Sequence, residues 1–554
     1  MPATLRASLV ARLDRIGAAA REVAQIGAVL GREFSYELIE PVAQRGAAEL
    51  QAALDRLAEA GLLFCRGVAP QSSYLFKNAL VQNAAYGTLL RTRRQELHAR
   101  VAAALEQHFA DLVERQPELL AHHLTGASDT ERAVDQWLKA GRHAAARLAH
   151  LEAIAHLERG LGLLGPVPES AGRDRRELEL RLALGLSHMT TKGMWSDEAG
   201  TAYERARELA ERCGDPQQQF QALYGLWQHS SGAGRMTVAR SLSARLLRVT
   251  ERGDDSGARL QAHHSAWTTA LFSGDAVAAR EHTEQGRRLY DPEQHRSHRY
   301  LYGGQDPGVC ARIIGAQAAW FLGNPDWSLA TAVDSISLAE SLAHPYSVGL
   351  ALGFAVAVRL YRGEPELAAQ LIDRAERLAA EQRFTLVVSP PIFRGAVLLA
   401  QGAAEEAVAA IRAGLPGWQP ALWRAQARAW LAEALLQEGK LAAALTAIGE
   451  GLADIEVTGE RSWESELHRL MGIVLLADTK GDEAEAYFRE ALDIARQTQR
   501  KALELRAATN LARFWGERGR RVEAREILAP IYGWFTEGFD TADLMDAKAL
   551  LDEL

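Results

Sequence analysis

The feature that most constrains this chain is a turn that recurs at a nearly constant distance along most of the sequence. Each turn holds a glycine and lies between two stretches of helix-forming residues. Consecutive marker glycines are 40, 49, 40, 39, 37, 42 and 38 residues apart, and such regularity predicts a repeat protein. The markers are Gly234, Gly274, Gly323, Gly363, Gly402, Gly439, Gly481 and Gly519.

The residues around each marker predict two helices that pack as a pair. A helix such as residues 425–435 (AQARAWLAEAL) precedes a marker, and one such as 483–492 (EAEAYFREAL) follows another. Alanines allow the two helices of a pair to approach each other closely, and larger apolar side chains fill the gaps between neighbouring pairs. The glycine at the turn ends the first helix. Because one pair cannot bury its apolar face alone, the pairs must stack. We therefore expect an α-solenoid of tetratricopeptide-like helix pairs over residues 166–554, with links longer than those of the standard repeat of about 34 residues.

The beginning of the chain follows a different pattern. Apolar spacing and glycine punctuation predict helices over residues 18–29, 36–42 and 47–60. Two short β-prone stretches follow at 62–65 and 74–76, with a turn-rich segment between them. Three helices followed by a hairpin is the order of a winged helix.

The expected fold class is all-α, in three parts. A winged-helix-like module occupies residues 1–110, connecting helices occupy 111–165, and the solenoid occupies 166–554. The connecting region is predicted to hold further helices between residues 117 and 164, with Asp129 or Thr130 as an N-cap.

A winged helix suggests DNA binding, so the charge of its third helix matters. That helix carries Glu49, Asp55 and Glu59 against the single basic residue Arg56. A recognition helix in the major groove would bring these carboxylates close to phosphates. Residues 1–110 contain 13 Lys/Arg and 10 Asp/Glu, which is barely basic. We therefore expect a structural or signalling use of this module and no nucleic-acid partner.

Composition narrows the remaining classes. The chain has 554 residues, 24% charged residues and a net charge of −8, so no strong basic field attracts nucleic acid. Its three cysteines, Cys65, Cys213 and Cys310, are too far apart for a CxxC pair or a disulfide framework. The first residues lack the regions of a signal peptide, and no stretch reaches 18 uninterrupted apolar residues. We expect a soluble cytoplasmic protein that does not enter a membrane.

Histidines and tryptophans give weak signals for binding. His295 and His298 lie close to two acids and could hold a metal on a helix, but a polar loop is the favoured interpretation. The adjacent pairs 122–123 and 263–264 point to different helix faces. Tryptophans at helix-interior positions, such as Trp430, are interpreted as core rather than as stacking platforms. No catalytic, cofactor-binding or metal-binding residue is assigned.

Several blocks of the sequence resemble a known family. The chain resembles the C-terminal half of bacterial class III adenylate/guanylate cyclases that also carry an AAA-type signal-transduction ATPase module. The resemblance covers essentially the whole chain. Its blocks are residues 12–17 (RLDRIG), 24–34 (AQIGAVLGREF), 76–86 (FKNALVQNAAY), 302–308 (YGGQDPG) and 532–541 (YGWFTEGFDT).

In that family the N-terminal half holds the cyclase and the nucleotide-binding module, and this chain carries the motifs of neither. A P-loop needs the motif Gly-x-x-x-x-Gly-Lys-Ser/Thr. The pair Gly439-Lys440 does not fit this motif, because Leu441 follows the lysine and the first glycine of the motif is missing. The sequence also predicts no sheet that could carry the two metal-binding aspartates of a cyclase. We therefore expect a non-enzyme without a cofactor.

The resemblance implies the non-catalytic sensor and protein-interaction region of a cyclase/ATPase-type signalling regulator. It would bind a protein, a peptide or a small effector on the solenoid, and it would act with an ATPase/cyclase module from another chain or another part of a longer one. The alternative is a DNA-binding transcriptional regulator of the ATPase/repeat type that uses the winged helix.

The place of a partner is the least constrained expectation. The repeat period lapses over residues 290–308, which are rich in Tyr, His, Arg, Gln and Asp. Long irregular segments in repeat proteins often carry function. The hypothesis is that Tyr302, Gln305 and Asp306 help to form a recognition surface. The alternative is a long turn that packs its tyrosines.

Overall fold

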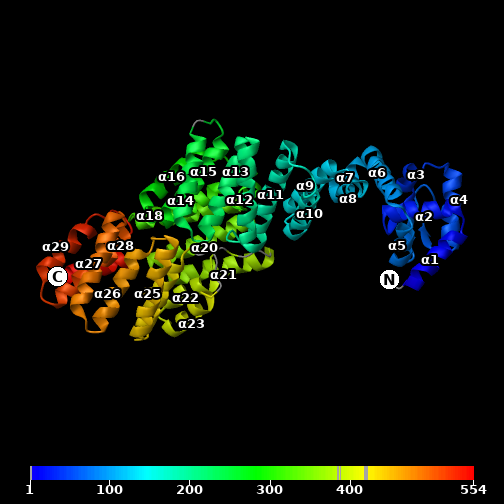
Figure 1. The fold of residues 1–554 in the computed structure, drawn as a ribbon. Helices are drawn as coiled ribbons and strands as arrows, with labels where there is room; N and C mark the ends of the chain where they lie inside the picture. The colour runs from blue at the N-terminus through cyan, green and yellow to red at the C-terminus, as the bar shows by residue number, and fades with distance from the viewer. Residues whose placement is uncertain (1–2, 252, 383–385, 387, 417–421) are drawn as a thin grey trace. The chain divides into compact units, whose positions relative to one another are not determined.

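The computed structural model describes residues 3–251, 253–382, 386, 388–416 and 422–554, without the side chains of residues 3–7 and 300. The chain divides into two compact units, residues 1–184 and 185–554, and helices dominate both (Figure 1). In the described part of the chain, no helix combines the length and the hydropathy needed to cross a membrane.

The first unit begins with a small module of helices around a three-stranded antiparallel sheet. Its strands lie in the order β1-β3-β2, with Phe34 and Cys65 both opposite Tyr74. The predicted helices and hairpin lie at the expected positions, but strand β1 was missed because three residues are too few to show a period. The elements are α1 (Ala3–Arg15), α2 (Ala18–Leu30), β1 (Glu33–Ser35), α3 (Tyr36–Ala43), α4 (Ala47–Glu59), β2 (Leu63–Arg66), β3 (Ser73–Phe76) and α5 (Ala79–Gly87).

Helices alone make up the rest of the first unit. Asp129 occupies the N-cap position of α9, as predicted, but its side chain makes no capping bond. His122 and His123 were expected to point to different faces of their helix, but their rings lie 5.2 Å apart and both pack against His98, at 5.6 and 5.2 Å. Nδ1 of His123 is 3.0 Å from Nδ1 of His98. These helices are α6 (Arg91–His108), α7 (Ala110–Arg115), α8 (Pro117–Ala127), α9 (Thr130–Ala146), α10 (His150–Leu164) and α11 (Ala171–Lys192), which crosses into the second unit.

The second unit is a solenoid of TPR-like helix pairs, as the period predicted. Successive helices pack side by side along the chain. After α12 (Asp197–Cys213) the helices are α13 (Pro216–Gly232), α14 (Met236–Thr250), α15 (Ser256–Phe272), α16 (Ala276–Leu289), α17 (His298–Leu301), α18 (Pro307–Phe321), α19 (Pro325–Ser341), α20 (Pro345–Arg362), α21 (Pro365–Gln382), α22 (Pro390–Ala400), α23 (Ala404–Gly414), α24 (Arg424–Gln437), α25 (Leu441–Thr458), α26 (Glu464–Ala477), α27 (Gly481–Gln497), α28 (Lys501–Glu517), α29 (Arg521–Tyr532) and α30 (Ala542–Glu553).

The marker glycines end the first helix of each pair in a left-handed conformation. Gly274, for example, has a φ of 95°. Its N–H donates to the carbonyl of Leu271, and the N–H of Asp275 donates to the carbonyl of Ala270. This pattern satisfies carbonyls that the helix end would otherwise leave open. Seven of the eight markers have a positive φ. The exception is Gly481, which begins α27, because Thr479 takes the left-handed position with a φ of 63°.

The paired helices form two layers. In α18, of the inner layer, every residue except Arg312 is buried, whereas α21, of the outer layer, buries a single stripe that includes Ala368 and Ile372. Each inner helix also packs against the next inner helix along the chain. The inner layer consists of α13, α15, α18, α20, α22, α24, α26, α28 and α30.

The repeats of the second unit fold back on one another. Helix α18 packs against α28, which lies far along the chain (Figure 1). The N–H of Arg461, in the link before α26, donates to the carbonyl of Phe272 at the turn of the α15–α16 pair, at 2.9 Å. The turn of the α15–α16 pair therefore contacts the link between α25 and α26. Early and late helices of the inner layer also pack against each other.

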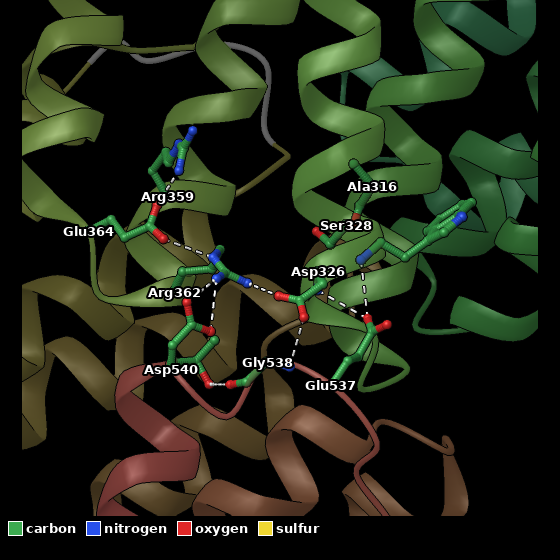
Figure 2. Close-up of polar contacts among 11 residues, drawn as sticks. Ala316, Asp326, Ser328, Arg359, Arg362, Glu364, Glu537, Gly538 and Asp540 are labelled. Atoms are coloured by element: carbon green, nitrogen blue, oxygen red, sulfur yellow. Dashed lines mark hydrogen bonds and ion pairs between the residues drawn. The ribbon is translucent and has the colours of Figure 1, made fainter.

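The segment between α29 and α30 closes this arrangement (Figure 2). One carboxylate oxygen of Glu537 accepts the N–H groups of Asp326 and Trp327, each at 3.1 Å, so it caps the N-terminus of α19 from another part of the chain. The N–H of Gly538 donates to Asp326 at 3.0 Å. The C-terminal repeats are thereby attached to the middle of the solenoid.

Candidate functional site

The inner layer leaves a hollow of about 350 Å³ between its later helices, which we call the polar basin. This volume is within the usual range for ligand pockets. The basin opens among α20, α22, α24, α26, α28 and α30. Its lining comprises Leu360, Tyr361, Ala396, Leu399, Ala400, Trp430, Glu433, Gln437, Trp463, Arg469, Arg506, Thr509, Asn510, Asp543 and Asp546.

Aromatic rings form one wall of the basin. The rings of Tyr361 and Trp463 lie 5.5 Å apart, and Trp320 stacks on Tyr361 at 4.2 Å from behind. The hydroxyl of Tyr361 accepts a hydrogen bond of 2.8 Å from Gln426, which fixes the ring. Trp430 packs edge-on against Phe393 at 5.4 Å and is only partly buried, so the prediction that it is a core residue holds for one side of its ring.

Paired charges form another part of the wall. Arg469 donates two hydrogen bonds, of 2.7 and 2.9 Å, to Glu466, and Arg506 reaches the same carboxylate at 3.2 Å. Burial alone would raise the pKa of Glu466, but the two guanidinium groups lower it to about 2. Glu466 is therefore ionised at neutral pH, and it fixes both arginines.

The remaining charged groups on this wall also have partners. Arg506 donates to Asp543 at 2.8 Å, and Arg469 donates to the side-chain oxygen of Asn510 at 2.8 Å. Asp546 accepts from Arg513 at 2.6 Å. The wall is a preformed network in which each of these charges is already balanced.

Glu433 differs from these groups. Among the described residues its carboxylate makes no hydrogen bond or ion pair, although it lines the basin. On balance the pKa of Glu433 is raised: burial is the largest cause, the charges of Glu466 and Asp543 add to the increase, and the charges of Arg469 and Arg506 oppose it. Glu433 shares one face of α24 with Trp430 and Gln437, three residues before it and four after it. The basin thus contains one acidic group without a partner.

A second, smaller hollow of about 80 Å³ lies among the earlier inner helices, and we call it the apolar pocket. Aromatic and aliphatic side chains dominate its lining, with a few polar groups. The residues are Met194, Trp227, Gln228, Ser231, His264, Thr268, Phe272, Gln305, Cys310, Ile313, Ile314, Leu350, Phe354, Leu422 and Trp423.

Trp423 stands at one end of the apolar pocket and is held in an unusual backbone conformation. Its φ is 72°, and its N–H donates to Glu460 at 3.1 Å. Its ring packs edge-on against Phe354 at 4.8 Å and lies 5.8 Å from Phe272. A left-handed tryptophan costs backbone energy, so these surrounding contacts over-determine its position.

The structure places the three residues of the predicted recognition surface in different environments. Tyr302 is 7% exposed, and its ring lies 5.0 Å from Tyr224 and 6.1 Å from Phe220. Its carbonyl accepts a hydrogen bond of 3.2 Å from Gln228. Tyr302 therefore acts on the inner layer as a packing residue.

Asp306 is 2% exposed and begins a helix. Its carboxylate accepts the N–H groups of Gly308 and Val309 at 2.9 and 3.1 Å, and the hydroxyl of Tyr290 at 3.1 Å. Burial raises the pKa of Asp306, while these hydrogen bonds lower it. This residue is the N-cap of α18, a role that the spacing Asp-Pro-Gly at the start of an apolar run could have signalled.

Gln305 lines the apolar pocket. Its side-chain oxygen accepts from the thiol of Cys310 at 3.1 Å. Tyr302 and Asp306 are buried and hold the segment in place, whereas Gln305 reaches a pocket, and no contact with a partner tests the predicted recognition surface. That surface stays a prediction.

The basin residues were not selected from the sequence, because they come from six helices that only the fold-back brings together. The sequence of α24 did contain one signal. Trp430, Glu433 and Gln437 share a face of this helix, and a carboxylate on a face that otherwise suits packing could have identified Glu433 as a candidate site residue.

His295 and His298, the two histidines of the irregular segment, bond to neighbouring protein groups. His295 accepts the N–H of Asp291 at 3.0 Å, and His298 is 2.9 Å from Gln261. Within the described ranges, no group of three or more His, Cys, Asp or Glu side chains is arranged to hold a metal ion.

Comparisons with known proteins place the chain only broadly. No family model matches it. An uncharacterised protein of Rhizobium meliloti (strain 1021) is 28% identical over 516 residues, which are 90% of this chain and 49% of that protein. The chain therefore spans about half the length of the curated relative that it matches.

Several solved structures are also similar. A signal transduction ATPase with numerous domains and a tetratricopeptide repeat sensor from Pyrococcus horikoshii is 12% identical, with a TM-score of 0.35 over 73% of this chain and 64% of that one. The Cut9–Hcn1 tetramer of the APC/C is 14% identical, with a TM-score of 0.47 over 83% and 92%. The apo quorum sensor NprR from B. thuringiensis is 11% identical, with a TM-score of 0.41 over 65% and 99%. All three scores are below 0.5, so the TPR-like architecture of this chain rests on its own helix pairs.

Proposed function

We propose that this chain is the non-catalytic sensor region of a signalling regulator and that it binds its effector on the inner layer of the solenoid. One observation carries the proposal. The inner layer is packed almost throughout, yet it keeps a basin of about 350 Å³ with the unpaired carboxylate of Glu433 on its wall. A hollow with fixed polar groups and aromatic sides is what a binding site requires.

The proposal extends to the type of regulator. The sequence blocks described above support a cyclase/ATPase-type protein, whose catalytic modules would lie on another chain or another part of a longer one. The chain matches only 49% of its relative from Rhizobium meliloti, which leaves room for such modules there. In this arrangement the effector acts on the solenoid, and the partner module carries out the chemistry.

A DNA-binding regulator is the second candidate function. It would require the first unit to bind DNA as a winged helix does. From α2 to β3 the element order of this unit is helix–strand–helix–helix–strand–strand, which supports a winged-helix-like module. However, Glu49, Asp55 and Glu59 are all exposed on α4, the helix that would enter the groove. Their charge opposes phosphate approach, so the sensor role is the better supported of the two.

The proposal is tested by filling the basin. Ala400 lines the basin and is exposed, so Ala400→Trp should occupy the hollow at little cost in stability. The matched control is Ala409→Trp, at an exposed position on the outer helix α23. A panel of metabolites and peptides is screened by thermal shift against the wild type and both variants.

We expect compounds that raise the melting temperature of the wild type and of Ala409→Trp but not of Ala400→Trp. Compounds that stabilise all three proteins equally would place binding outside the basin. A panel with no stabilising compound at all would count against the sensor role.

A further inference from the structure

The charges that line the basin are not balanced. Three carboxylates and two guanidinium groups face it, those of Glu433, Asp543, Asp546, Arg469 and Arg506. The other charges that contact this set, on Glu466 and Arg513, cancel each other. One negative charge is therefore left over, and it belongs to the group without a partner, Glu433.

The two arginines are poorly placed to receive an anion. Arg469 uses its guanidinium on Glu466 and Asn510, and Arg506 is bound to Glu466 and Asp543. The guanidinium of Arg506 also lies 5.1 Å from the ring of Trp320. An anion would have to break these pairs, whereas a cation would find Glu433 open.

The surroundings of Glu433 suit an organic cation better than a metal ion. Trp430 lies on the same face of α24, and Tyr361 and Trp463 form the adjoining wall. Aromatic faces attract ammonium groups and bury aliphatic stems. No metal-holding group of three side chains occurs in the part of the chain that the structure describes.

We infer that the polar basin binds an alkylammonium group, with the carboxylate of Glu433 as its counter-ion and the aromatic wall along its carbon stem. The inference rests on the proposed function and names the ligand class of that same site. A free amine and the side chain of a lysine in a peptide share this chemistry. In both cases the ligand supplies the charge that the basin lacks.

Isothermal titration calorimetry on the full chain at low ionic strength tests the inference. The probes are spermidine as a free amine and acetyl-Ala-Lys-Ala-amide as a lysine peptide, and acetyl-Ala-norleucine-Ala-amide is the neutral counterpart. The decisive variant is Glu433→Gln, which keeps the shape and removes the charge. Its matched control is Glu517→Gln, which removes the same charge at an exposed position outside the basin.

We expect at least one cationic probe to bind, the neutral peptide not to bind, and Glu433→Gln to weaken binding about tenfold or more. Glu517→Gln should bind as the wild type does. Because the carboxylate of Glu433 makes no hydrogen bond or ion pair among the described residues, and burial opposes its charge, Glu433→Gln should melt close to the wild-type temperature. Preference for spermidine or for the lysine peptide identifies the source of the ammonium group.

Two results would overturn the inference: no binding of either cationic probe at millimolar concentration, or equal binding by Glu433→Gln and the wild type. Neither result touches the proposed function, because the panel screened with Ala400→Trp is not restricted to cations. If that screen finds a basin ligand that ignores Glu433, the sensor role stands and the ammonium assignment fails.

Discussion

The guanidinium of Arg362 holds the carboxylate of Asp540 through two hydrogen bonds of 2.9 and 3.0 Å, although 178 residues separate them (Figure 2). Arg362 also donates to Asp326 at 2.8 Å and to Glu364 at 2.9 Å. The side chain of Arg362 is 4% exposed, whereas that of Asp540 is 72% exposed. One buried cation thus joins the turn after α20, the start of α19 and the C-terminal segment.

The two partners should differ in their effect on stability. Arg362→Ala removes the hydrogen bonds that one buried guanidinium makes to three carboxylates, and the loss of several such charged hydrogen bonds should cost about 3 kcal/mol. Asp540→Asn removes an exposed charge and should cost about 1 kcal/mol or less. Urea denaturation of the two variants measures both free energies.

The contrast also has a structural readout. With Arg362→Ala, amide hydrogen exchange should rise in the segment around Gly538, because that segment loses its anchor. Equal free energies of unfolding for the two variants would show that the fold-back does not depend on Arg362.

The marker glycines should divide into two groups. Gly323 has a φ of 84°, and a Cβ there would lie 2.6 Å from Trp534 and 2.8 Å from Lys501. Gly439 has a φ of 74° with nothing within 4 Å. Alanine at Gly439 should therefore cost only the backbone strain, about 1 kcal/mol, and alanine at Gly323 about 2–4 kcal/mol because the contact with the late repeats must also open.

Thermal denaturation of Gly323→Ala and Gly439→Ala measures this difference. The same logic separates turns that only end a helix from turns that also receive another repeat. If both variants lost the same stability, the contact between early turns and late links would contribute nothing.

The layout of the fold could be predicted because its signals are local. The period of the glycines and the alanine-rich helices are set by residues close in sequence, and the helix pairs lie where they were expected. The fold-back could not be predicted, because it depends on contacts such as that of Arg461 with Phe272, which leave no periodic trace. Strand β1 and the left-handed Thr479 are local features, but they could not be predicted either, because three residues or one residue are too few to form a recognisable sequence pattern.

The site was harder to predict than the fold. A rich irregular segment drew attention to Tyr302 and Asp306, but polar and aromatic residues in such a segment can serve packing and capping equally well. The basin residues each look ordinary in their own helix. Glu433 becomes a candidate only when the neighbours that could have paired with it are known.

The segment between α16 and α18 gives a third prediction. Tyr302→Ala should cost about 3 kcal/mol, because it empties a buried ring position, and Asp306→Ala about 1–2 kcal/mol, because it removes the cap of α18. Gln305→Ala should stay within about 1 kcal/mol of the wild type. A triple substitution would thus confound binding with stability, whereas Gln305→Ala alone tests recognition at the apolar pocket.

Calorimetric melting of the three single variants checks these costs, and the effector screen checks binding. An effect of Gln305→Ala on a ligand without a change in melting temperature would support its role in recognition. A large drop in melting temperature for Gln305→Ala would assign it to packing with the other two.

The last prediction concerns the carboxylate that holds Trp423. Glu460 is 1% exposed and accepts hydrogen bonds from the N–H of Trp423 and the hydroxyl of Ser462. Burial raises the pKa of Glu460 from its ordinary value of 4.5 to about 7, although these two hydrogen bonds and the charge of Arg500 lower it; the charge of Asp454 adds to the increase. The folded protein therefore binds a proton here between pH 4.5 and 7 that the unfolded chain has released.

Because the folded state holds more protons in that window, this group makes stability fall as the pH rises from about 4.5 to about 7. The loss from Glu460 alone is on the order of 3 kcal/mol. In Glu460→Gln this part of the pH dependence should vanish, whereas the exposed control Glu517→Gln should retain it. Denaturant melts at half-unit steps of pH measure the slopes, with Trp fluorescence as the probe since Trp423 depends on this carboxylate. A slope in Glu460→Gln equal to that of the wild type would show that Glu460 is already ionised in the folded protein at pH 5, with Arg500 compensating its burial.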